Sequence, residues 1–429
     1  MPPEPRLGPL SGLLVVDCST VLAGPYCTML LGDLGADVIK VEPPDGDATR
    51  GWGPPWVGSA GAGTRTAAYY LAINRNKRSI RLDLKTIEGR DVLRRLLTRG
   101  DVVVENFRVG GFARLGFDDG ALERLNPGLI HLAISGFGPT GPSAALPGYD
   151  FVIQAMSGLM SITGDADEDG GRPTKVGVAI SDVVTGMLGA VSVLAALVGR
   201  GRGDVGKELM SGAAEPPSAG AAVGSGGQRI DISLLGATLA SLVNQAQNAF
   251  VTSEAPGRMG NAHPNIVPYE TFETADQPIA VSVGSDRQWP RFCEVLGLPQ
   301  LATDPRFVSN GDRVGSRAEL RPILANRFRA RAAADWLTAL AGASIPCGPI
   351  NDIAAAFASA EAQELGMVVE QDHPAWGLIR QVGVPFTLSA TPATIRTPPP
   401  ALGEQTDEIL AELGYSADEV AGLRARGTI

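Results

Sequence analysis

The sequence predicts an α/β protein built around a parallel sheet with helices on its faces. Over the first 200 residues, short runs rich in β-branched residues alternate with helical segments, which is typical of a parallel sheet. The chain has 429 residues, 44% of them hydrophobic, so it is long enough to bury a large core and to form more than one domain.

Four runs are predicted to be strands of this sheet: LLVVD (13–17), DVIKVE (37–42), DVVVEN (101–106) and LIHLAIS (129–135). Between the first two, Pro25 suits the first turn of a helix and Gly35 suits its end. A second, amphipathic helix is predicted to stop at Gly100, just before the third strand. Strand and helix therefore alternate from the start of the chain.

The only long apolar stretch spans residues 183–199 and directly follows Asp182. Its length and small side chains favour a helix buried in a core over a membrane span. Residues 201–228 then lack a hydrophobic period and contain many Gly, Ala, Pro and Ser residues, which predicts a flexible linker or insertion. Beyond it we expect a helix over 228–253 and two strands around a turn within 268–284.

The charge balance excludes some classes of partner. With 36 basic and 46 acidic residues the net charge is -10, which argues against nucleic-acid binding and requires any anionic ligand to find a local basic patch. The four cysteines, at 18, 27, 293 and 347, form no CxxC pair, so neither a disulfide framework nor a zinc site is predicted. The N-terminus lacks the pattern of a signal peptide, and we expect a cytoplasmic protein.

Common catalytic motifs are missing or misplaced. GxGxxG occurs at 136–141 and 201–206, but neither copy opens a helix after a strand, so both are interpreted as turn glycines. The sequence contains no HExxH and no GxSxG, and its three histidines are widely spaced. We therefore predict no metal site and no serine hydrolase.

Two features have both a structural and a functional interpretation. Positive charge is concentrated between Arg75 and Lys85, where it forms either a solvated edge or a phosphate site, and the residues alone favour the edge. Asp182, just before the apolar helix, is either an N-cap or a carboxylate nucleophile held near a helix end. Without further information capping ranks first.

The order of several longer segments changes this balance. The segments are VLAGPYCTMLLGDLGADVIKVEPPDGDATRGW, NRNKRSIRLDLKTIEGRDVL, DVVVENFRVGGFARLGF, LNPGLIHLAISGFGPTGP, GYDFVIQAMSGLMSITG, GRPTKVGVAISDVVTGMLGAVSVLAAL, GNAHPNIVPYETF, IPCGPIND, HPAWGLIRQVGVPF and LGEQTDEILAELG. Together they cover nearly the whole chain. In this set and order the sequence resembles the class III CoA-transferase family, which contains formyl-CoA transferase and carnitine CoA-transferase.

The resemblance implies roles for individual residues. The family's catalytic aspartate corresponds to Asp182, and polar groups beside the acyl-transfer centre correspond to Tyr149 and Asp150. Gly260 and Asn261 open a segment that serves in some members as a lid over the intermediate. The implied CoA-binding residues are Val21, Ala23, Asn76, Lys77, Arg78, Asn106, Phe107 and Arg114. The basic cluster is then expected to bind CoA phosphates.

The resemblance also implies an architecture. We expect a large Rossmann-like CoA-binding domain from residues 1–200 and 331–429, a linker at 201–228 and a small α+β domain at 229–330. Two ring-shaped subunits are expected to interlock as a homodimer. No tightly bound cofactor, no nucleic acid and no membrane partner are expected.

The expected reaction moves CoA from an acyl-CoA, with succinyl-CoA or another small dicarboxylyl-CoA as a candidate, to a free carboxylic acid. Asp182 would form first a mixed anhydride and then an aspartyl-CoA thioester, which preserves the activation of the acyl group. Two alternatives are an α-methylacyl-CoA racemase and a non-catalytic CoA-binding protein. The racemases use a histidine from a GHD motif, whereas this chain has Tyr149 at that position, and tyrosine is the poorer proton shuttle at neutral pH.

Overall fold

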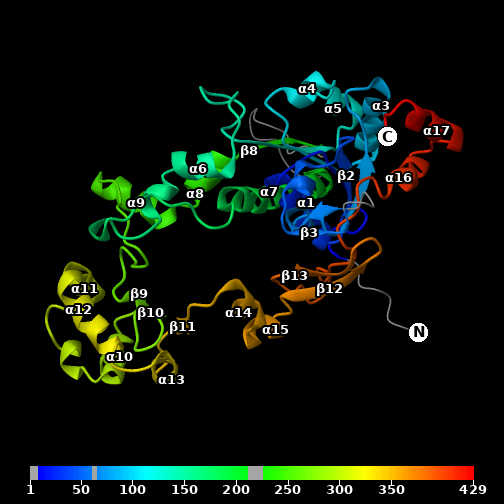
Figure 1. Cartoon of the computed structure of the whole chain (residues 1–429). Helices are drawn as coiled ribbons and strands as arrows, with labels where there is room; N and C mark the ends of the chain where they lie inside the picture. Colours follow the sequence, from blue (N-terminus) through cyan, green and yellow to red (C-terminus); the bar gives the residue numbers. More distant parts are fainter. Residues whose placement is uncertain (1–7, 60–64, 211–225) are drawn as a thin grey trace. The chain divides into compact units, whose positions relative to one another are not determined.

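A computed structural model describes residues 8–59, 65–210 and 226–429 of the chain, apart from the side chains of 202–210 (Figure 1). The chain divides into two compact units. The larger contains Met1–Ser157, Gly177–Val243 and Ala360–Ile429, and the smaller contains Gly158–Val176 and Asn244–Ser359. The first and the last described segments of the chain thus belong to the larger unit.

A six-stranded parallel sheet forms the centre of the larger unit, with the strand order β5-β2-β1-β6-β7-β8. Its strands are β1 (Leu14–Asp17), β2 (Asp37–Glu42), β5 (Lys77–Arg81), β6 (Val102–Glu105), β7 (Ile130–Ser135) and β8 (Arg229–Ser233). This is the strand order of the Rossmann fold: strands are added on one side of β1 as far as β5 and on its other side from β6 onwards, so the strand order reverses between β1 and β6. The four predicted strands are confirmed to within one residue at each end.

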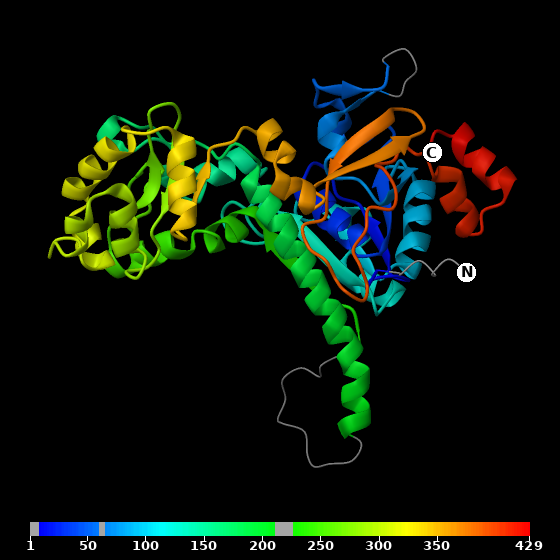
Figure 2. The same cartoon turned by 90° about the horizontal axis from the view of Figure 1, so that it is seen from below.

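Helices cover both faces of this sheet, as predicted. On one face α1 (Ala23–Asp33) and α7 (Ile180–Met210) pack together over Val15 and Val102. On the other, α3 (Ile87–Arg99) and α16 (Thr406–Glu412) cover Val16, since successive residues of a strand face opposite sides. Figure 2 shows the long α7. The remaining helices of this unit are α2 (Ala68–Leu71), α4 (Gly111–Arg114), α5 (Asp119–Leu125), α6 (Asp150–Met156), α8 (Leu234–Ala240), α15 (Ala360–Glu364) and α17 (Ala417–Ala425).

A short 3-10 helix, Ala48–Gly51, and two hairpins complete the described elements of the larger unit. The hairpins pair β3 (Trp56–Val57) with β4 (Thr66–Ala67), and β12 (Val368–His373) with β13 (Gly377–Val382).

The smaller unit has its own antiparallel sheet and core. The sheet contains β9 (Tyr269–Phe272), β10 (Ile279–Ser282) and β11 (Cys347–Pro349), and the predicted hairpin of β9 and β10 is confirmed. Trp289 and Trp336 are fully buried in its core. Its helices are α9 (Val243–Thr252), α10 (Trp289–Leu296), α11 (Asn310–Gly315), α12 (Arg317–Phe328), α13 (Ala333–Gly342) and α14 (Ile353–Ala358).

The bounds of the units differ from those expected for the domains. Residues 229–233 form β8, which pairs with β7 and so belongs to the large sheet instead of the predicted helix and small domain. Residues 331–359 belong to the smaller unit, because the Trp336 ring packs on Phe328 with centroids 5.1 Å apart.

Helix α7 departs from two expectations. It continues to Met210, so residues 201–210 are helical where a linker was predicted, and residues 211–225 of that linker lie outside the described residues. The predicted burial in a core holds for one face only: Val193 is fully buried, whereas Val191 is 60% exposed. By length and composition Ile180–Gly201 is one helix that could cross a membrane, but a single such helix is weak evidence for a membrane protein, because the core helix of another protein passes the same test.

Candidate active site

Asp182 lies in the first turn of α7 with 9% of its surface exposed. Ala23, the first residue of α1, lines the same cavity as Asp182, and its backbone N–H favours the ionised form of the Asp182 carboxylate, which lowers its pKa. Because α7 begins at Ile180, Asp182 is already inside the helix, and the Ser181 N–H is instead bound by Asp150 (2.8 Å). The capping interpretation therefore fits Asp150 better than Asp182.

The pKa of Asp182 is raised to about 7. Burial is the main cause, the charge of Asp150 adds to it, and the Ala23 N–H opposes both. Asp150 is itself held in place, because its Oδ2 accepts a hydrogen bond of 2.8 Å from Gln154 Nε2. A poorly hydrated carboxylate with a raised pKa is a stronger nucleophile once ionised, and such groups occur at reactive centres more often than elsewhere.

The loop after β1 leads into Ala23 and has an unusual conformation. Val21 has a φ of 71°, a left-handed value that strains a β-branched residue. Before it, Thr20 is bound on both sides by the side chain of Asn106, which follows β6. This loop therefore lies at the point where the strand order of the sheet reverses, which is where open α/β sheets bind ligands.

A cavity of about 250 Å³ opens beside Asp182. It brings together six of the predicted site residues: Val21, Ala23, Asn106, Phe107, Tyr149 and Asp182. Residues 144–148, from the segment between β7 and α6, also line it. This segment starts and ends at a direct backbone contact: a Cβ added at Gly136 would lie 2.6 Å from the Gly148 Cα, so neither position accepts a side chain.

A second, larger cavity of about 470 Å³ lies at the carboxyl ends of β1, β2 and β5. Most of its lining is apolar, and three cations, Lys85, Arg108 and Arg114, line it as well. Thr20, Phe107 and Arg108 belong to both cavities. The two cavities thus form neighbouring parts of one crevice, with Asp182 in one part and most of the positive charge in the other.

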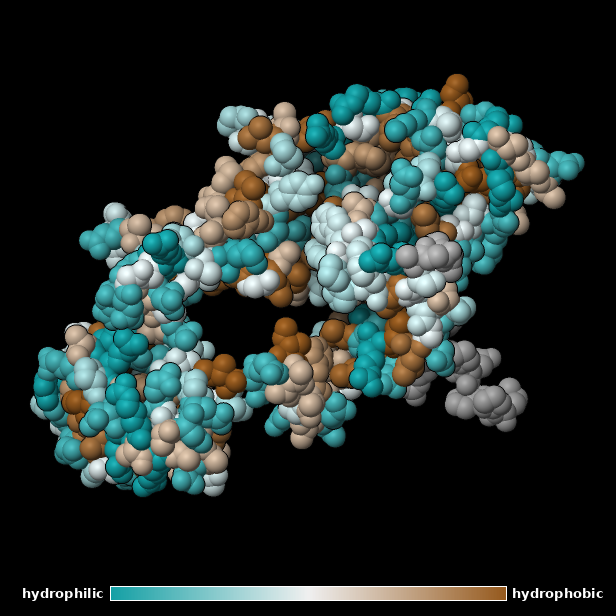
Figure 3. All heavy atoms as spheres, viewed as in Figure 1, coloured by the Kyte–Doolittle hydropathy of each residue, from teal (hydrophilic) through white to brown (hydrophobic). Residues whose placement is uncertain are grey.

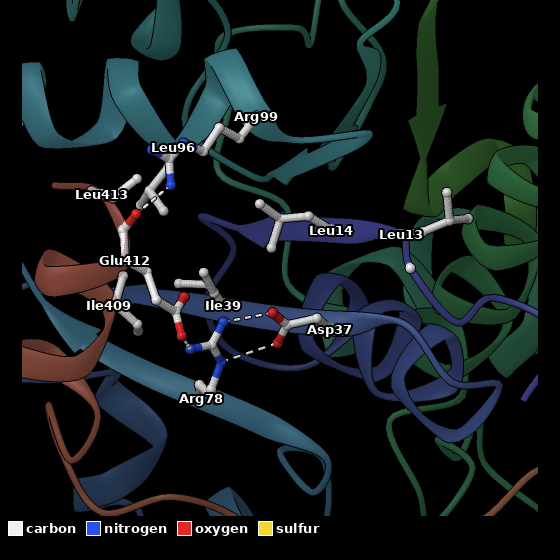
Figure 4. Close-up of a pocket in the computed structure, with 11 residues that line it drawn as sticks. Leu13, Leu14, Asp37, Ile39, Arg78, Leu96, Arg99, Ile409, Glu412 and Leu413 are labelled. Carbon is white, nitrogen blue, oxygen red and sulfur yellow. Dashed lines mark hydrogen bonds and ion pairs between the residues drawn. The ribbon is translucent and has the colours of Figure 1, made fainter. Parts of the chain in front are cut away.

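Three side chains that were predicted to bind CoA instead bind other residues of the protein. Lys77 is buried, and its Nζ lies 3.0 Å from Asp17 Oδ2. Asn76 is buried against Asp33 and residues of the C-terminal segment. Arg78 lies at the opposite, amino edge of the sheet, where it pairs with Asp37 and Glu412 beside a cavity of about 230 Å³ (Figure 4). That these three side chains bind CoA phosphates stays a prediction, and their positions in the structure do not support it.

Other predicted residues lie in different places. Arg114 lines the larger cavity of the crevice, as Phe107 does. Gly260 and Asn261 belong to the smaller unit, where Asn261 lines a separate cavity of about 320 Å³. Within residues 8–59, 65–210 and 226–429, no group of three or more His, Cys, Asp or Glu side chains could hold a metal ion.

Sequence reasoning missed Tyr69, in α2. Burial, followed by the charges of Asp182 and Asp150, raises the pKa of Tyr69 to about 12, so it is a neutral hydroxyl near the two carboxylates. Its ring packs edge-on against Trp52, with centroids 5.2 Å apart. No motif marked this tyrosine, because only the fold brings α2 close to the start of α7.

Known proteins resemble this chain over nearly its whole length. The family model described as CoA-transferase family III matches residues 10–216 and 219–406. The succinate–glutarate CoA-transferase of Agrobacterium fabrum is 43% identical over 95% of this chain and 96% of its own length. The human succinyl-CoA:glutarate CoA-transferase is 37% identical over 99% of this chain and 90% of its own. A crystal structure of a CAIB/BAIF family protein from Brucella suis superposes with a TM-score of 0.78 at 40% identity, covering 95% of this chain and all of that one.

The site predicts a pH dependence for any reaction in which Asp182 is the nucleophile. The reactive form is the carboxylate, so kcat/KM should rise with pH and level off above about 7. Asp150→Asn removes the repelling charge and keeps an acceptor for the Ser181 N–H, so the midpoint should move to lower pH. Rates measured between about pH 5 and pH 9 test this.

Asp91→Asn is the matched control, since Asp91 lies on α3 and pairs with Arg94 and Arg95. It should leave the midpoint unchanged. The same midpoint in wild type and Asp150→Asn would contradict the coupling of the two carboxylates.

Proposed function

Since the chain belongs to CoA-transferase family III, we propose that it transfers CoA between small dicarboxylic acids and that Asp182 is its nucleophile. The observation that carries the mechanism is a buried carboxylate with a raised pKa in a crevice at the switch point of a Rossmann-type sheet. The names of the relatives support the substrate class, because they specify succinate, glutarate, mesaconate and oxalate.

The transfer consists of four acyl substitutions. The Asp182 carboxylate attacks the thioester carbonyl of the donor and expels CoA thiolate, which leaves a mixed anhydride. The thiolate then attacks the aspartyl carbonyl, so that the donor acid departs and an aspartyl-CoA thioester remains. The acceptor carboxylate attacks this thioester to give a new anhydride, and the thiolate finally attacks the acceptor's carbonyl. Asp182 is regenerated and the new acyl-CoA is released.

Two features of the site favour these steps. The low exposure of Asp182 limits the access of water, which would hydrolyse the anhydride and lose the activation of the acyl group. The Ala23 N–H, at the positive end of α1, favours the ionised carboxylate and can donate to the oxyanion that forms on the same group.

The crevice offers a path for CoA. The larger cavity combines apolar walls suited to an adenine ring with Lys85, Arg108 and Arg114 for phosphates, while the cavity beside Asp182 is suited to the thioester end. These cations replace Lys77 and Arg78 in the proposal, because the latter two are already paired with carboxylates.

We further propose a homodimer, with the outer face of α7 and part of α6 covered by a second copy. Exposed apolar side chains lie on both helices: Met187, Leu188, Val191 and Val198 on α7, and Phe151, Val152 and Met156 on α6. Figure 3 shows apolar surface around α6 and α8. Large apolar side chains exposed on neighbouring helices are typical of subunit contacts. The proposed location remains the cytoplasm, and the four cysteines are present as free thiols.

The first prediction concerns the reaction and its nucleophile. With succinyl-CoA as donor, glutarate should be a better acceptor than the monocarboxylate of equal length. Asp182→Asn should lower transfer by more than about a thousand-fold, because no anhydride can form on an amide. Hydroxylamine added with acyl-CoA should modify Asp182 in the wild type, as detected by mass spectrometry of the peptide.

The same variant should fold. Since burial raises the pKa of Asp182 to about 7, the folded state favours the protonated form and loses stability as pH rises through that value. Asp182→Asn should therefore be more stable than wild type at about pH 8, by at least about 1 kcal/mol, and less different at about pH 5. Near wild-type transfer by Asp182→Asn would exclude the mechanism, whereas Asp91→Asn should transfer normally.

The second prediction concerns the cations of the crevice. Arg114→Ala should raise KM for the acyl-CoA about ten-fold or more, since charge-assisted contacts to phosphate are worth roughly 1.5–3 kcal/mol. The difference in KM between Arg114→Ala and wild type should become smaller at high ionic strength, because salt screens exposed charges. Arg124→Ala, an exposed arginine on α5, is the control. Equal KM values for Arg114→Ala and wild type would remove Arg114 from the CoA site.

The third prediction concerns the dimer. Val191→Asp places a charge in the proposed contact and should shift the protein towards a monomer in light scattering coupled to size-exclusion chromatography. Ile87→Asp is the control, since Ile87 is exposed at the start of α3. A monomeric wild type would refute the proposed dimer.

A further inference from the structure

We propose that Asn106 is a positioning residue for the reaction: its side-chain amide holds the loop after β1 in the conformation that directs the Ala23 N–H at Asp182. The inference rests on the proposed role of Asp182 and adds a residue that acts without touching the reacting atoms.

Asn106 binds Thr20 through both sides of its amide. The Thr20 N–H donates to Asn106 Oδ1 over 2.9 Å, and Asn106 Nδ2 donates to the Thr20 carbonyl over 2.7 Å. The two residues follow β1 and β6, which are neighbouring strands with Asp17 opposite Val104. The amide therefore ties together the two loops that flank the switch point of the sheet.

This clamp adjoins the strained residue of the loop. Val21 immediately follows Thr20, and its φ of 71° is one that a β-branched residue adopts only where its surroundings enforce it. A second contact acts on Val21 itself, whose N–H lies 3.5 Å from Asp47 Oδ1. Asp47 is fixed in turn by its buried ion pair with Lys40 (2.9 Å). With Asn106 removed, the weaker contact to Asp47 would have to hold the strained conformation by itself.

The loop conformation sets the direction of one N–H group. Ala23 is two residues beyond Val21 and begins α1, while Asp182 lies near the start of α7. The two helices pack closely at this point, since a Cβ added at Gly186 would lie 2.6 Å from the Ala23 carbonyl oxygen. The body of α1 is thus fixed against α7, and the part that can change is the loop leading into it.

The experiment measures kcat, KM and the pH midpoint of Asn106→Ala. We expect kcat to fall about ten-fold or more, since loss of one oxyanion donor typically costs 10²–10³-fold and the loop will keep part of its population in place. KM for the acyl-CoA should change little. The midpoint of kcat/KM should move to higher pH, because the Ala23 N–H favours the ionised Asp182. Asp150 and Tyr69, which couple electrostatically to Asp182, are unaltered, and so are Tyr149 and Arg108, which line the same cavity.

A rescue variant distinguishes positioning from binding. Glycine adopts left-handed φ values without strain, so Asn106→Ala/Val21→Gly should recover several-fold in kcat and return the midpoint towards that of wild type. Asn126→Ala is the matched control, because Asn126 also bridges backbone groups, those of Leu97, Gly100 and Gly128, but lies far from the crevice in the large unit. It should lower the melting temperature and leave kcat and the midpoint unchanged.

Three results would overturn the inference. An unchanged kcat and midpoint in Asn106→Ala would show that the clamp is dispensable. A rise in KM alone would assign Asn106 to CoA binding. A loss that Val21→Gly fails to rescue would separate Asn106 from the strained loop. If Asn106→Ala does not fold, Asn106→Gln, which keeps the amide but misplaces it by one methylene, is measured against the same expectations.

Failure of the proposed function gives a different result. In that case Asp182→Asn retains transfer, whatever the Asn106 variants do. An inactive Asp182→Asn with a normal Asn106→Ala removes only the positioning role.

Discussion

Buried ion pairs beneath the carboxyl edge of the large sheet constrain everything built on that edge. Asp17 with Lys77, and Lys40 with Asp47, are completely shielded from solvent at their side chains. Burial alone would raise the pKa of Asp17, but Lys77 and Lys40 lower it to about 2, so it stays ionised. Burial lowers the pKa of Lys77 to about 8, with Asp17 opposing the shift, so Lys77 keeps its charge at neutral pH. Removing either partner would leave a buried charge without its counterion, which destabilises the fold far more than the loss of a surface ion pair.

These pairs connect the sheet to the surroundings of Asp182. Lys40 also donates to the Ser19 carbonyl (3.0 Å), and Asp47 contacts the Val21 N–H, so the loop after β1 is attached to the buried charges at two points. The loop leads to Ala23, whose backbone N–H favours the ionised form of Asp182. A strained backbone and a poorly hydrated carboxylate are both unfavourable by themselves. The network of buried ion pairs holds the strained backbone and the poorly hydrated carboxylate next to each other.

The local pattern of the sequence predicted those strands and helices whose own residues show a hydrophobic or β-branched pattern. β-Branched runs predicted four of the six strands of the large sheet. β5 was missed because its sequence, KRSIR, begins with charged residues, and the sequence prediction placed β8 in a helix. Lys77 looked like a surface cation because its partner, Asp17, lies 60 residues away in the sequence. Asp182 was singled out by its position before an apolar helix and by family resemblance, but its raised pKa depends on burial and on Asp150. Tyr69 was missed for the same reason, since its surroundings arise only from tertiary packing.

The contact between Gly136 and Gly148 has a consequence for how this site can diversify. The two glycines close the segment 137–147 at its base, so the chain leaves β7 and returns to Tyr149 and Asp150 at almost the same point. Entropy penalises a longer closed loop only weakly. Residues can therefore be inserted, deleted or exchanged within this segment, which lines the cavity at 144–147, while the carboxylate pair stays in register. The shape of the cavity beside Asp182 can then change while the two carboxylates keep their positions.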